Sequence, residues 1–285
     1  MDVGIGLPNA VLDVRGPELV DWGRRAEAAG FSVLGTIGRV VYSNHDDLIS
    51  LASVAGVTER IGLMTSVLVP AGRQAVLLAK QAATLSAVSN GRFRLGIGIG
   101  GRDDDWLALG VAAEHRGRVL EAAIATCRKV WAGEAPDGVD HPVGPEPNDL
   151  RLVLGGYTES AFRRAGRLAD AILLGPMPPE AVGAAIQLAT EAAVDAGRKP
   201  PARYAARYAA LGDDAQDEAD RNAQSYYGFG GPGMVEAVAG SILRTPEAIK
   251  EALSALEQVG VEEVCLWPSA AGLEQVDRIA DAALR

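Results

Sequence analysis

Glycine is the residue type that recurs where this 285-residue chain would be expected to do chemistry. Two apolar runs end in glycine-rich segments, Gly98-Ile99-Gly100-Gly101 and Gly155-Gly156. Backbone that lacks Cβ atoms lets a flat ligand approach closely. The same run ends carry few acids, no histidine and no serine–histidine pair. The pattern predicts a site that holds a cofactor, with the cofactor supplying the reactivity. Tight strand–helix packing is the alternative explanation of these glycines.

Two hydroxyl residues follow the second glycine pair. Thr158 and Ser160 stand immediately before, and within, a predicted helix over 159–168. A helix N-terminus offers free N–H groups and the positive end of the helix dipole, which suits a cofactor phosphate. The alternative for Thr158 is an ordinary N-cap.

Two further residues near a predicted strand end are catalytic candidates, Arg39 and His45. An arginine does not accept a proton at neutral pH, but it can hold an anionic substrate. The alternative for Arg39 is a surface salt bridge with Asp46 or Asp47. The alternative for His45 is a solvated loop residue.

Three acids and a group of aromatic residues complete the candidates. The run 103–105 resembles a set of metal ligands, but we expect it to open a helix, where acids favour the dipole. Tyr226, Tyr227 and Phe229 lie among glycines and either form a mobile flap over the substrate or pack in place.

The elements that must position these residues alternate along the chain. Apolar runs predict strands at 3–7, 31–36, 61–69, 93–99, 151–154, 171–174, 203–211 and 263–267. Helical patterns occupy 17–30, 46–57, 74–88, 113–131, 159–168, 179–196, 246–259 and 273–284, with a helical insertion at 213–243 after the seventh strand. Eight alternations predict a single (β/α)8 barrel domain over 1–285. An open doubly wound sheet would need its glycine motif after the first strand, whereas Gly4 and Gly6 lie inside it.

Composition excludes several classes. The net charge of −10 argues against a nucleic-acid partner, because a phosphate backbone requires a basic face. Cys127 and Cys265 are far apart and are expected to be buried thiols, and no histidine–cysteine cluster suggests a metal site. The chain opens directly into a strand, and no apolar stretch is long enough to span a membrane. We therefore expect a cytoplasmic protein.

Taken together, these segments resemble the superfamily of luciferase-like flavin monooxygenases and coenzyme F420-dependent oxidoreductases. The most specific blocks are Lys80-Gln81-Ala82-Ala83-Thr84-Leu85 and the run 89–98, Ser-Asn-Gly-Arg-Phe-Arg-Leu-Gly-Ile-Gly. The resemblance extends from about residue 3 to residue 284.

The resemblance implies a (β/α)8 barrel that holds a flavin or the deazaflavin F420 at the carboxyl ends of its strands. It implies that Ser66 and Val67, followed by Leu68, form a non-proline cis peptide behind the cofactor ring. It places Gly98, Gly100 and Gly101 beside the cofactor, and the phosphate at the segment that carries Gly155, Gly156, Thr158 and Ser160. It also implies a homodimer.

Departures from the family pattern bear on the reaction. Many members carry an acid and a histidine where this chain has Gly38 and Arg39, and the alcohol and sugar-phosphate dehydrogenases place a glutamate where Gly101 stands. Alcohol oxidation with two protein acid/base groups is therefore disfavoured. The block Thr65-Ser66-Val67-Leu68 resembles the deazaflavin enzymes, and Ile99 replaces an arginine typical of luciferases. The resemblance thus favours F420-dependent hydride transfer to or from a small organic substrate. The alternatives are an FMN-dependent monooxygenase and a non-catalytic flavin-binding protein.

Overall fold

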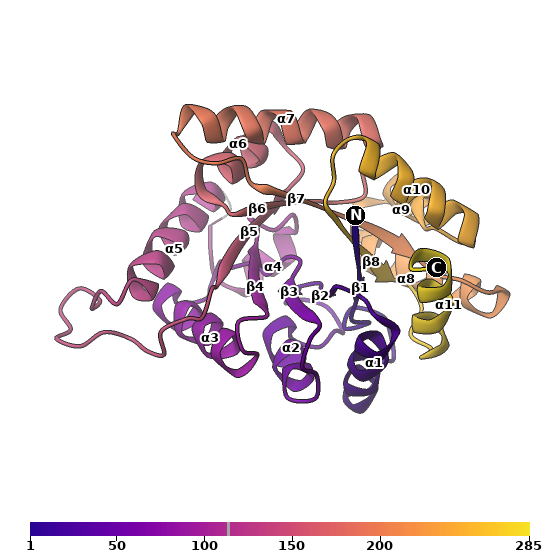
Figure 1. Ribbon diagram of the computed structural model, residues 1–285, viewed down its shortest axis with the longest axis horizontal. Coiled ribbons are helices and arrows are strands. Elements are labelled where there is room, and N and C mark those ends of the chain that lie inside the picture. The colour runs from indigo at the N-terminus through magenta and orange to yellow at the C-terminus, as the bar shows by residue number, and fades with distance from the viewer. Residues whose placement is uncertain (113–114) are drawn as a thin grey trace.

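A computed structural model describes the whole chain except residues 113 and 114. Its eight parallel strands close into a barrel in the sequence order β1 to β8, and helices surround it (Figure 1). The strands are β1 (Asp2–Gly6), β2 (Val33–Thr36), β3 (Gly62–Thr65), β4 (Phe93–Ile97), β5 (Arg151–Gly156), β6 (Ala171–Leu174), β7 (Ala202–Ala209) and β8 (Glu263–Pro268). The predicted (β/α)8 barrel is confirmed, and the open-sheet alternative is excluded because β1 pairs with β8.

The helices follow the predicted alternation, with one short addition at 103–108 before the fourth predicted helix. They are α1 (Gly16–Ala29), α2 (Asp47–Ala55), α3 (Ala75–Val88), α4 (Asp103–Ala108), α5 (Arg116–Trp131), α6 (Glu159–Leu168), α7 (Pro179–Asp195), α8 (Gln216–Tyr227), α9 (Pro232–Ser241), α10 (Pro246–Gln258) and α11 (Glu274–Ala283). The first residues of the helix predicted at 113–131 lie outside the described part of the chain. The insertion after β7 consists of α8 and α9 with the short 3₁₀ turns η2 (Asp213–Ala215) and η3 (Gly228–Gly230), as expected.

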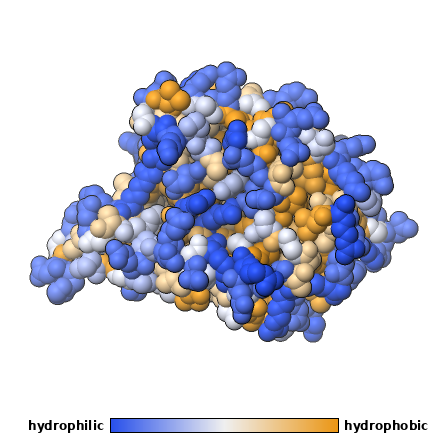
Figure 2. Space-filling view, in the orientation of Figure 1, coloured by the Kyte–Doolittle hydropathy of each residue, from blue (hydrophilic) through white to orange (hydrophobic). Residues whose placement is uncertain are grey.

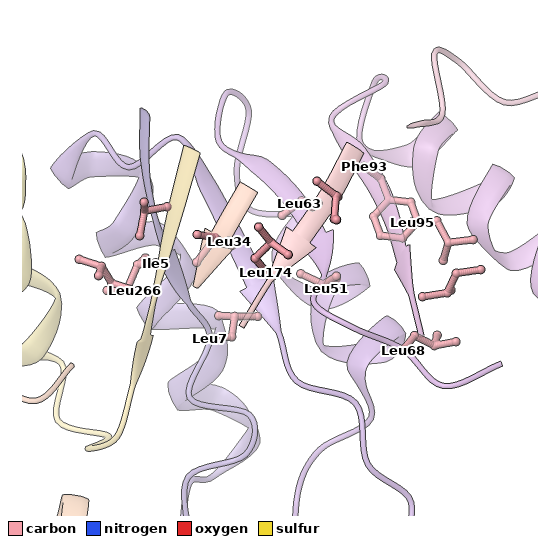
Figure 3. Packing of buried hydrophobic residues seen from close by; sticks show 14 of the residues in the cluster. Ile5, Leu7, Leu34, Leu51, Leu63, Leu68, Phe93, Leu95, Leu174 and Leu266 are labelled. Carbon is pink, nitrogen blue, oxygen red and sulfur yellow. The ribbon is translucent and has the colours of Figure 1, made fainter. Parts of the chain in front are cut away.

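Alternating residues along each strand build two separate cores. In β1, Val3 and Ile5 face the surrounding helices, where they pack with residues such as Leu34, Leu63 and Leu95 (Figure 3). Burial of such side chains on the outer face of a parallel sheet is what fixes the helices against it. The second core fills the barrel interior and includes Val33, Met64, Val153, Leu173, Tyr204, Tyr208, Cys265 and Trp267.

The N-terminal end of the barrel interior contains an ion pair. The carboxylate of Glu263, on β8, pairs with Arg94, on β4, and accepts a hydrogen bond of 2.7 Å from the Ser32 hydroxyl. The Arg94 guanidinium also lies 5.2 Å from the ring centroid of Tyr204. These polar contacts satisfy a charge that would otherwise be costly inside the barrel. They leave the opposite end, where the strands finish, for the candidate site.

Two strand boundaries differ from the sequence prediction in ways that matter for the site. The apolar run 61–69 predicts one long strand, but β3 ends at Thr65. Beyond it the Ser66 N–H bonds the carbonyl of Thr36, on β2, and the Leu68 N–H bonds that of Gly96, on β4. The run therefore still bonds both neighbouring strands beyond Thr65, although the regular ladder of β3 ends there. Conversely, β5 continues two residues beyond the predicted end and includes Gly155 and Gly156.

Hydrophilic residues cover most of the molecular face in Figure 2, including the loop between α5 and β5 that projects at the left of Figure 1. No helix among the described residues is long and apolar enough to cross a membrane. Cys127 and Cys265 are both buried free thiols, as the sequence predicts. Burial raises the pKa of Cys127 to about 12, so this thiol stays protonated and unreactive.

Candidate functional site

Glycines from neighbouring strands make room for other side chains of the protein in the upper layer of the barrel interior. A Cβ atom at Gly98 would lie 2.9 Å from a methyl carbon of Val67, and one at Gly155 would lie 2.8 Å from the other. A Cβ atom at Gly35 would lie 2.8 Å from the sulfur of Cys265. Because Gly98 and Gly155 have no side chains, Val67 can sit between the ends of β4 and β5. The glycines thus shape the barrel mouth around the segment that follows β3.

The segment after β3 is held from several sides. The peptide bond between Ser66 and Val67 is cis, as the family resemblance implied. The Ser66 hydroxyl donates to the Thr36 carbonyl at 3.0 Å and accepts from the indole N–H of Trp267 at 3.2 Å. Val67 is half-buried, whereas Leu68 is fully buried in the outer core against the helices. Ser66 and Val67 therefore lie at the mouth of the barrel, whereas the Leu68 side chain holds the segment by packing in the core between the strands and the helices.

The N-terminus of α6 lies at the end of β5. Thr158 is its N-cap residue, and its hydroxyl accepts a hydrogen bond from the Ala161 N–H at 3.3 Å. The hydroxyls of Thr158 and Ser160 are 3.1 Å apart. A Cβ atom at Gly156 would lie 2.4 Å from that of Ala161, so the absence of a side chain lets the helix start close to the strand. The N-cap alternative for Thr158 is correct, and it leaves both hydroxyls together at the positive end of the helix dipole.

The glycines after β4 have different surroundings from one another. Gly100 has φ of +71°, which favours glycine, and a Cβ atom there would lie 3.1 Å from Val69 and 3.3 Å from the indole nitrogen of Trp106. A Cβ atom at Gly101 would contact nothing within 4 Å. Gly100 is therefore explained by local packing, whereas Gly101 borders open space.

Arg39 is not the exposed residue that its surface alternative requires. Its side chain is 2% exposed, and its charge is paired with Asp104 at 3.3 Å and Asp105 at 3.4 Å, rather than with Asp46 or Asp47. Its guanidinium carbon lies 5.0 Å from the ring centroid of Tyr42 and 5.1 Å from that of Tyr226. Cation–π contacts of this kind add to the ion pairs. Arg39 therefore joins the loop after β2 to α4 and α8.

The remaining polar candidates have structural partners. The ring nitrogen Nε2 of His45 lies 2.8 Å from the Val14 carbonyl oxygen, in the loop after β1, so this half-buried histidine is neither free nor fully solvated. The acids at 103–105 begin α4, as predicted, and the described residues contain no cluster suited to a metal ion. The proposed metal-ligand pattern is thus explained by the helix start.

Aromatic residues of the insertion cover the barrel mouth. The hydroxyls of Tyr208, on β7, and Tyr227, on α8, lie 2.6 Å apart, and the Tyr208 and Trp267 rings pack at 5.2 Å between centroids. Tyr226 and Tyr227 are half-buried, so they pack over the mouth, whereas Phe229 is 52% exposed and lies against Arg102 at 3.8 Å. The three aromatics named by the sequence therefore divide into two that cover the site and one on the surface.

A small cavity of about 10 Å³ remains beneath this cover. That volume holds about one water molecule. Its lining comes from the ends of β1, β2, β7 and β8 and from α8 and α9, with Ile37, Tyr208, Asn222, Tyr227 and Ser269 among its members. Sequence reasoning missed Tyr208 and Asn222. For Tyr208 the sequence did contain a signal, because alternate residues of a strand share one face and Tyr204, Ala206 and Tyr208 alternate in the seventh strand.

Sequence reasoning placed Asn9 at the end of the first strand but gave it no role; it lies after β1 and directly follows Pro8. Asn9 is fully buried and donates to the carbonyls of Ile37 at 2.9 Å and His45 at 3.2 Å. Its Oδ1 accepts from the Ile37 N–H at 3.1 Å. These bonds fix the start of the loop that carries Arg39.

Asp47 gives the wall of the site a titratable group. Its carboxylate is 2% exposed at the start of α2, and a Cβ atom at Gly38 would lie 2.5 Å from its Oδ2. Burial raises the pKa of Asp47 from 3.8 to about 6, although Arg73 lies 3.2 Å away and opposes the shift. The folded protein therefore binds this proton more tightly than the unfolded chain does.

We expect the contribution of Asp47 to the free energy of unfolding to fall as the pH rises from about 4 to above 6. The total loss should be about 3 kcal/mol, because each unit of raised pKa corresponds to roughly 1.4 kcal/mol. The Asp47→Asn variant lacks this titration, so its stability relative to the parent should increase by that amount between pH 4 and pH 7. Urea unfolding of both proteins across this range tests it, and parallel pH profiles would contradict it.

The structure combines a closed (β/α)8 barrel with glycines at the mouth and a helix N-terminus that carries two hydroxyls. The family model described as luciferase-like monooxygenase matches residues 1–283. The chain therefore belongs to the luciferase-like monooxygenase family.

Relatives within this family are distant. An uncharacterised protein of Mycobacterium tuberculosis is 32% identical over 141 residues, and the match spans 46% of this chain and only about half (50%) of that protein. A 5,10-methylenetetrahydromethanopterin reductase of Methanolobus tindarius is 28% identical over 204 residues, covering 69% of this chain and 62% of the reductase. Among solved structures, an F420-dependent secondary alcohol dehydrogenase in complex with an F420–acetone adduct has a TM-score of 0.81 at 17% identity, covering 99% of this chain and 98% of that one. At that identity the likeness concerns the fold.

Proposed function

We propose that the protein is an F420-dependent oxidoreductase that transfers a hydride between the deazaflavin and a small organic substrate bound in the barrel mouth. The observation that carries this proposal is that Ser66 and Val67, seated among glycines at the mouth, occur together with a helix N-terminus that presents two hydroxyls. The first suits a flat ring, and the second suits a phosphate. The two catalytic candidates, Arg39 and His45, are both engaged by other protein groups.

The residues present fit such a cofactor. In the proposal Ser66 and Val67 support one face of the ring, Gly98 and Gly155 seat Val67 in that position, and Gly101 leaves room beside the ring. The N–H groups at the start of α6, with the hydroxyls of Thr158 and Ser160, receive the phosphate. When bound, the deazaflavin supplies a hydride donor or acceptor that reacts poorly with oxygen. The protein then orients the ring and substrate, and Tyr226 and Tyr227 exclude water above them.

The choice between F420 and FMN rests on the sequence block at 65–68 and on Ile99, both of which favour the deazaflavin branch. The family also includes enzymes described as monooxygenases, so an FMN-dependent monooxygenase is the alternative. A non-catalytic flavin-binding protein is a third possibility, supported by Gly38 and Arg39 standing where other members carry an acid and a histidine.

We expect the purified protein to bind F420 with micromolar or tighter affinity and FMN much more weakly. The indole of Trp267 donates to Ser66, so quenching of tryptophan fluorescence should report cofactor binding directly. Titrations with each cofactor measure the preference. Oxidation of bound reduced F420 by a carbonyl compound, without oxygen uptake, would complete the evidence. A preference for FMN with oxygen consumption would favour the monooxygenase, and flavin that binds without turnover would favour the non-catalytic alternative.

A further inference from the structure

A buried arginine on β7 has no acidic partner. Arg207 is 7% exposed. Its guanidinium donates hydrogen bonds to the carbonyls of Gly175 at 3.2 Å, Ala206 at 2.8 Å and Met177 at 2.6 Å. Within the part of the chain that the structure describes, no carboxylate forms a salt bridge with it. Carbonyl oxygens satisfy N–H groups but do not neutralise the charge, and burial accordingly lowers the pKa of Arg207.

Two other arginine side chains of the barrel have acids beside them. Arg94 pairs with Glu263, and Arg39 pairs with Asp104 and Asp105. A neutral side chain can donate to carbonyls without the cost of burying a charge, so hydrogen bonds to carbonyls alone do not explain an arginine. A buried cation that lacks a carboxylate among the described residues points instead to an anion from outside the chain.

Arg207 lies beside the start of α6. Its contact with Gly175 brings the guanidinium from β7 to the residue that directly follows β6. The strands β5, β6 and β7 are neighbours in the barrel (Figure 1), and a Cβ atom at Gly175 would overlap the phenol of Tyr157, which directly follows β5. Thr158, the N-cap residue of α6, comes next in the chain. The charge therefore lies about one strand spacing, roughly 5 Å, from the end of β5 that leads into α6.

The charges around this helix start favour an anion. Glu159, the acid in the first turn of α6, is paired with Arg163 at 2.8 Å. The hydroxyl-bearing residues Thr158 and Ser160 are exposed and can meet a ligand. The positive end of the helix dipole and the cation of Arg207 thus act on the same place from two sides. A phosphate bound there is stabilised by both.

We infer that Arg207 is a positioning residue that supplies the countercharge for the cofactor's phosphate at the start of α6. Its hydrogen bonds to carbonyls hold the guanidinium behind Gly175, so its charge acts on the phosphate without a direct contact. The inference rests on the proposed function, which identifies the phosphate as part of the cofactor, and it adds a residue from a different strand to that site. Because F420 and FMN both carry a phosphate, the role of Arg207 is the same for either cofactor.

Paired ligands with and without the phosphate measure this role. F420 is compared with its phosphate-free deazaflavin core, and FMN with riboflavin, by tryptophan quenching at constant ionic strength. We expect Arg207→Gln, which can still donate to carbonyls, to reduce the preference for the phosphorylated member of a bound pair about tenfold. Arg207→Lys keeps the charge and should retain the preference to within about threefold. The control is Arg203→Gln, on the same strand but paired with Glu262 at 2.8 Å, which should leave the preference unchanged.

A purely structural role of Arg207 leads to a different result. Arg207→Gln and Arg207→Lys would then lower the melting temperature and weaken both members of each pair equally. A preference that stays intact in Arg207→Gln would therefore overturn the inference. Should this variant not fold, Arg207→Met removes the same charge and is judged by the same preference.

Inorganic phosphate tests the site in the cofactor-free protein. Compared with chloride at equal ionic strength, phosphate should raise the melting temperature of the parent protein and raise that of Arg207→Gln less. Equal shifts in the two proteins would overturn the inference. If the parent protein did not bind F420 but its phosphate effect required Arg207, the proposed function would fall and the phosphate site would stand. F420 binding with a preference that does not depend on Arg207 would have the reverse meaning.

Discussion

Gly156→Val should weaken F420 binding by about 100-fold while the barrel stays folded. A Cβ atom at this position would lie 2.4 Å from the Cβ of Ala161, and a change of rotamer moves neither atom. The start of α6 must therefore move outward, carrying the Thr158 and Ser160 hydroxyls with it. Loss of two charge-assisted hydrogen bonds to a phosphate corresponds to about 3 kcal/mol, which is roughly a factor of 100 in Kd.

A matched variant separates this local effect from a general loss of stability. A Cβ atom at Gly23, on α1, would lie 2.4 Å from a methyl carbon of Val54, so Gly23→Val creates a comparable clash between two helices on another part of the barrel. It should lower the melting temperature similarly and leave the F420 affinity unchanged. Equal affinity losses in the two variants would show that α6 does not hold the phosphate, and unchanged affinity in Gly156→Val would move the site elsewhere.

The barrel itself could be predicted because its signal is local and repeated. Buried parallel strands read as short apolar runs, and each is followed by an amphipathic helix with its own start and stop residues. Thr158 before Glu159 and Thr245 before Pro246 mark two helix starts that the structure reproduces at the predicted residues. The resemblance supplied the cis bond between Ser66 and Val67, which periodicity could not indicate.

The contacts that close the site could not be read from the sequence, because they join distant segments. The surface alternative paired Arg39 with Asp46 or Asp47, its neighbours in the chain, whereas the fold pairs it with Asp104 and Asp105. Asp46 and Asp47 instead form salt bridges with Arg73. Local charge patterns suggest the nearest partner, but the closed barrel brings the ends of successive strands together and offers others. The cavity at Asn222 depends in the same way on where the insertion lies.

The Gly96→Ala variant should be the most destabilising single change considered for this barrel. A Cβ atom at Gly96, on β4, would lie 1.8 Å from the carbonyl oxygen of Thr65, on β3. The clash involves backbone, so no rotamer change relieves it. Thr65 is also tied to Gly96 by two hydrogen bonds, accepting from its N–H at 2.9 Å and donating to its carbonyl at 2.7 Å. Separating the strands would break both.

We expect Gly96→Ala to lower the free energy of unfolding by about 3 kcal/mol or more, or the melting temperature by about 6 °C. Gly101→Ala is the control, because a Cβ atom there meets open space and the loss of unfolded-chain entropy should leave its stability equal or slightly higher. Thermal and urea unfolding measure both. Since Ser66 follows Thr65 directly, the displaced strand end should also shift Ser66 and Val67 and so weaken the proposed binding of the cofactor. Unchanged stability in Gly96→Ala would mean that β3 and β4 do not approach this closely, and the arrangement of Val67 between Gly98 and Gly155 would then have to be revised with them.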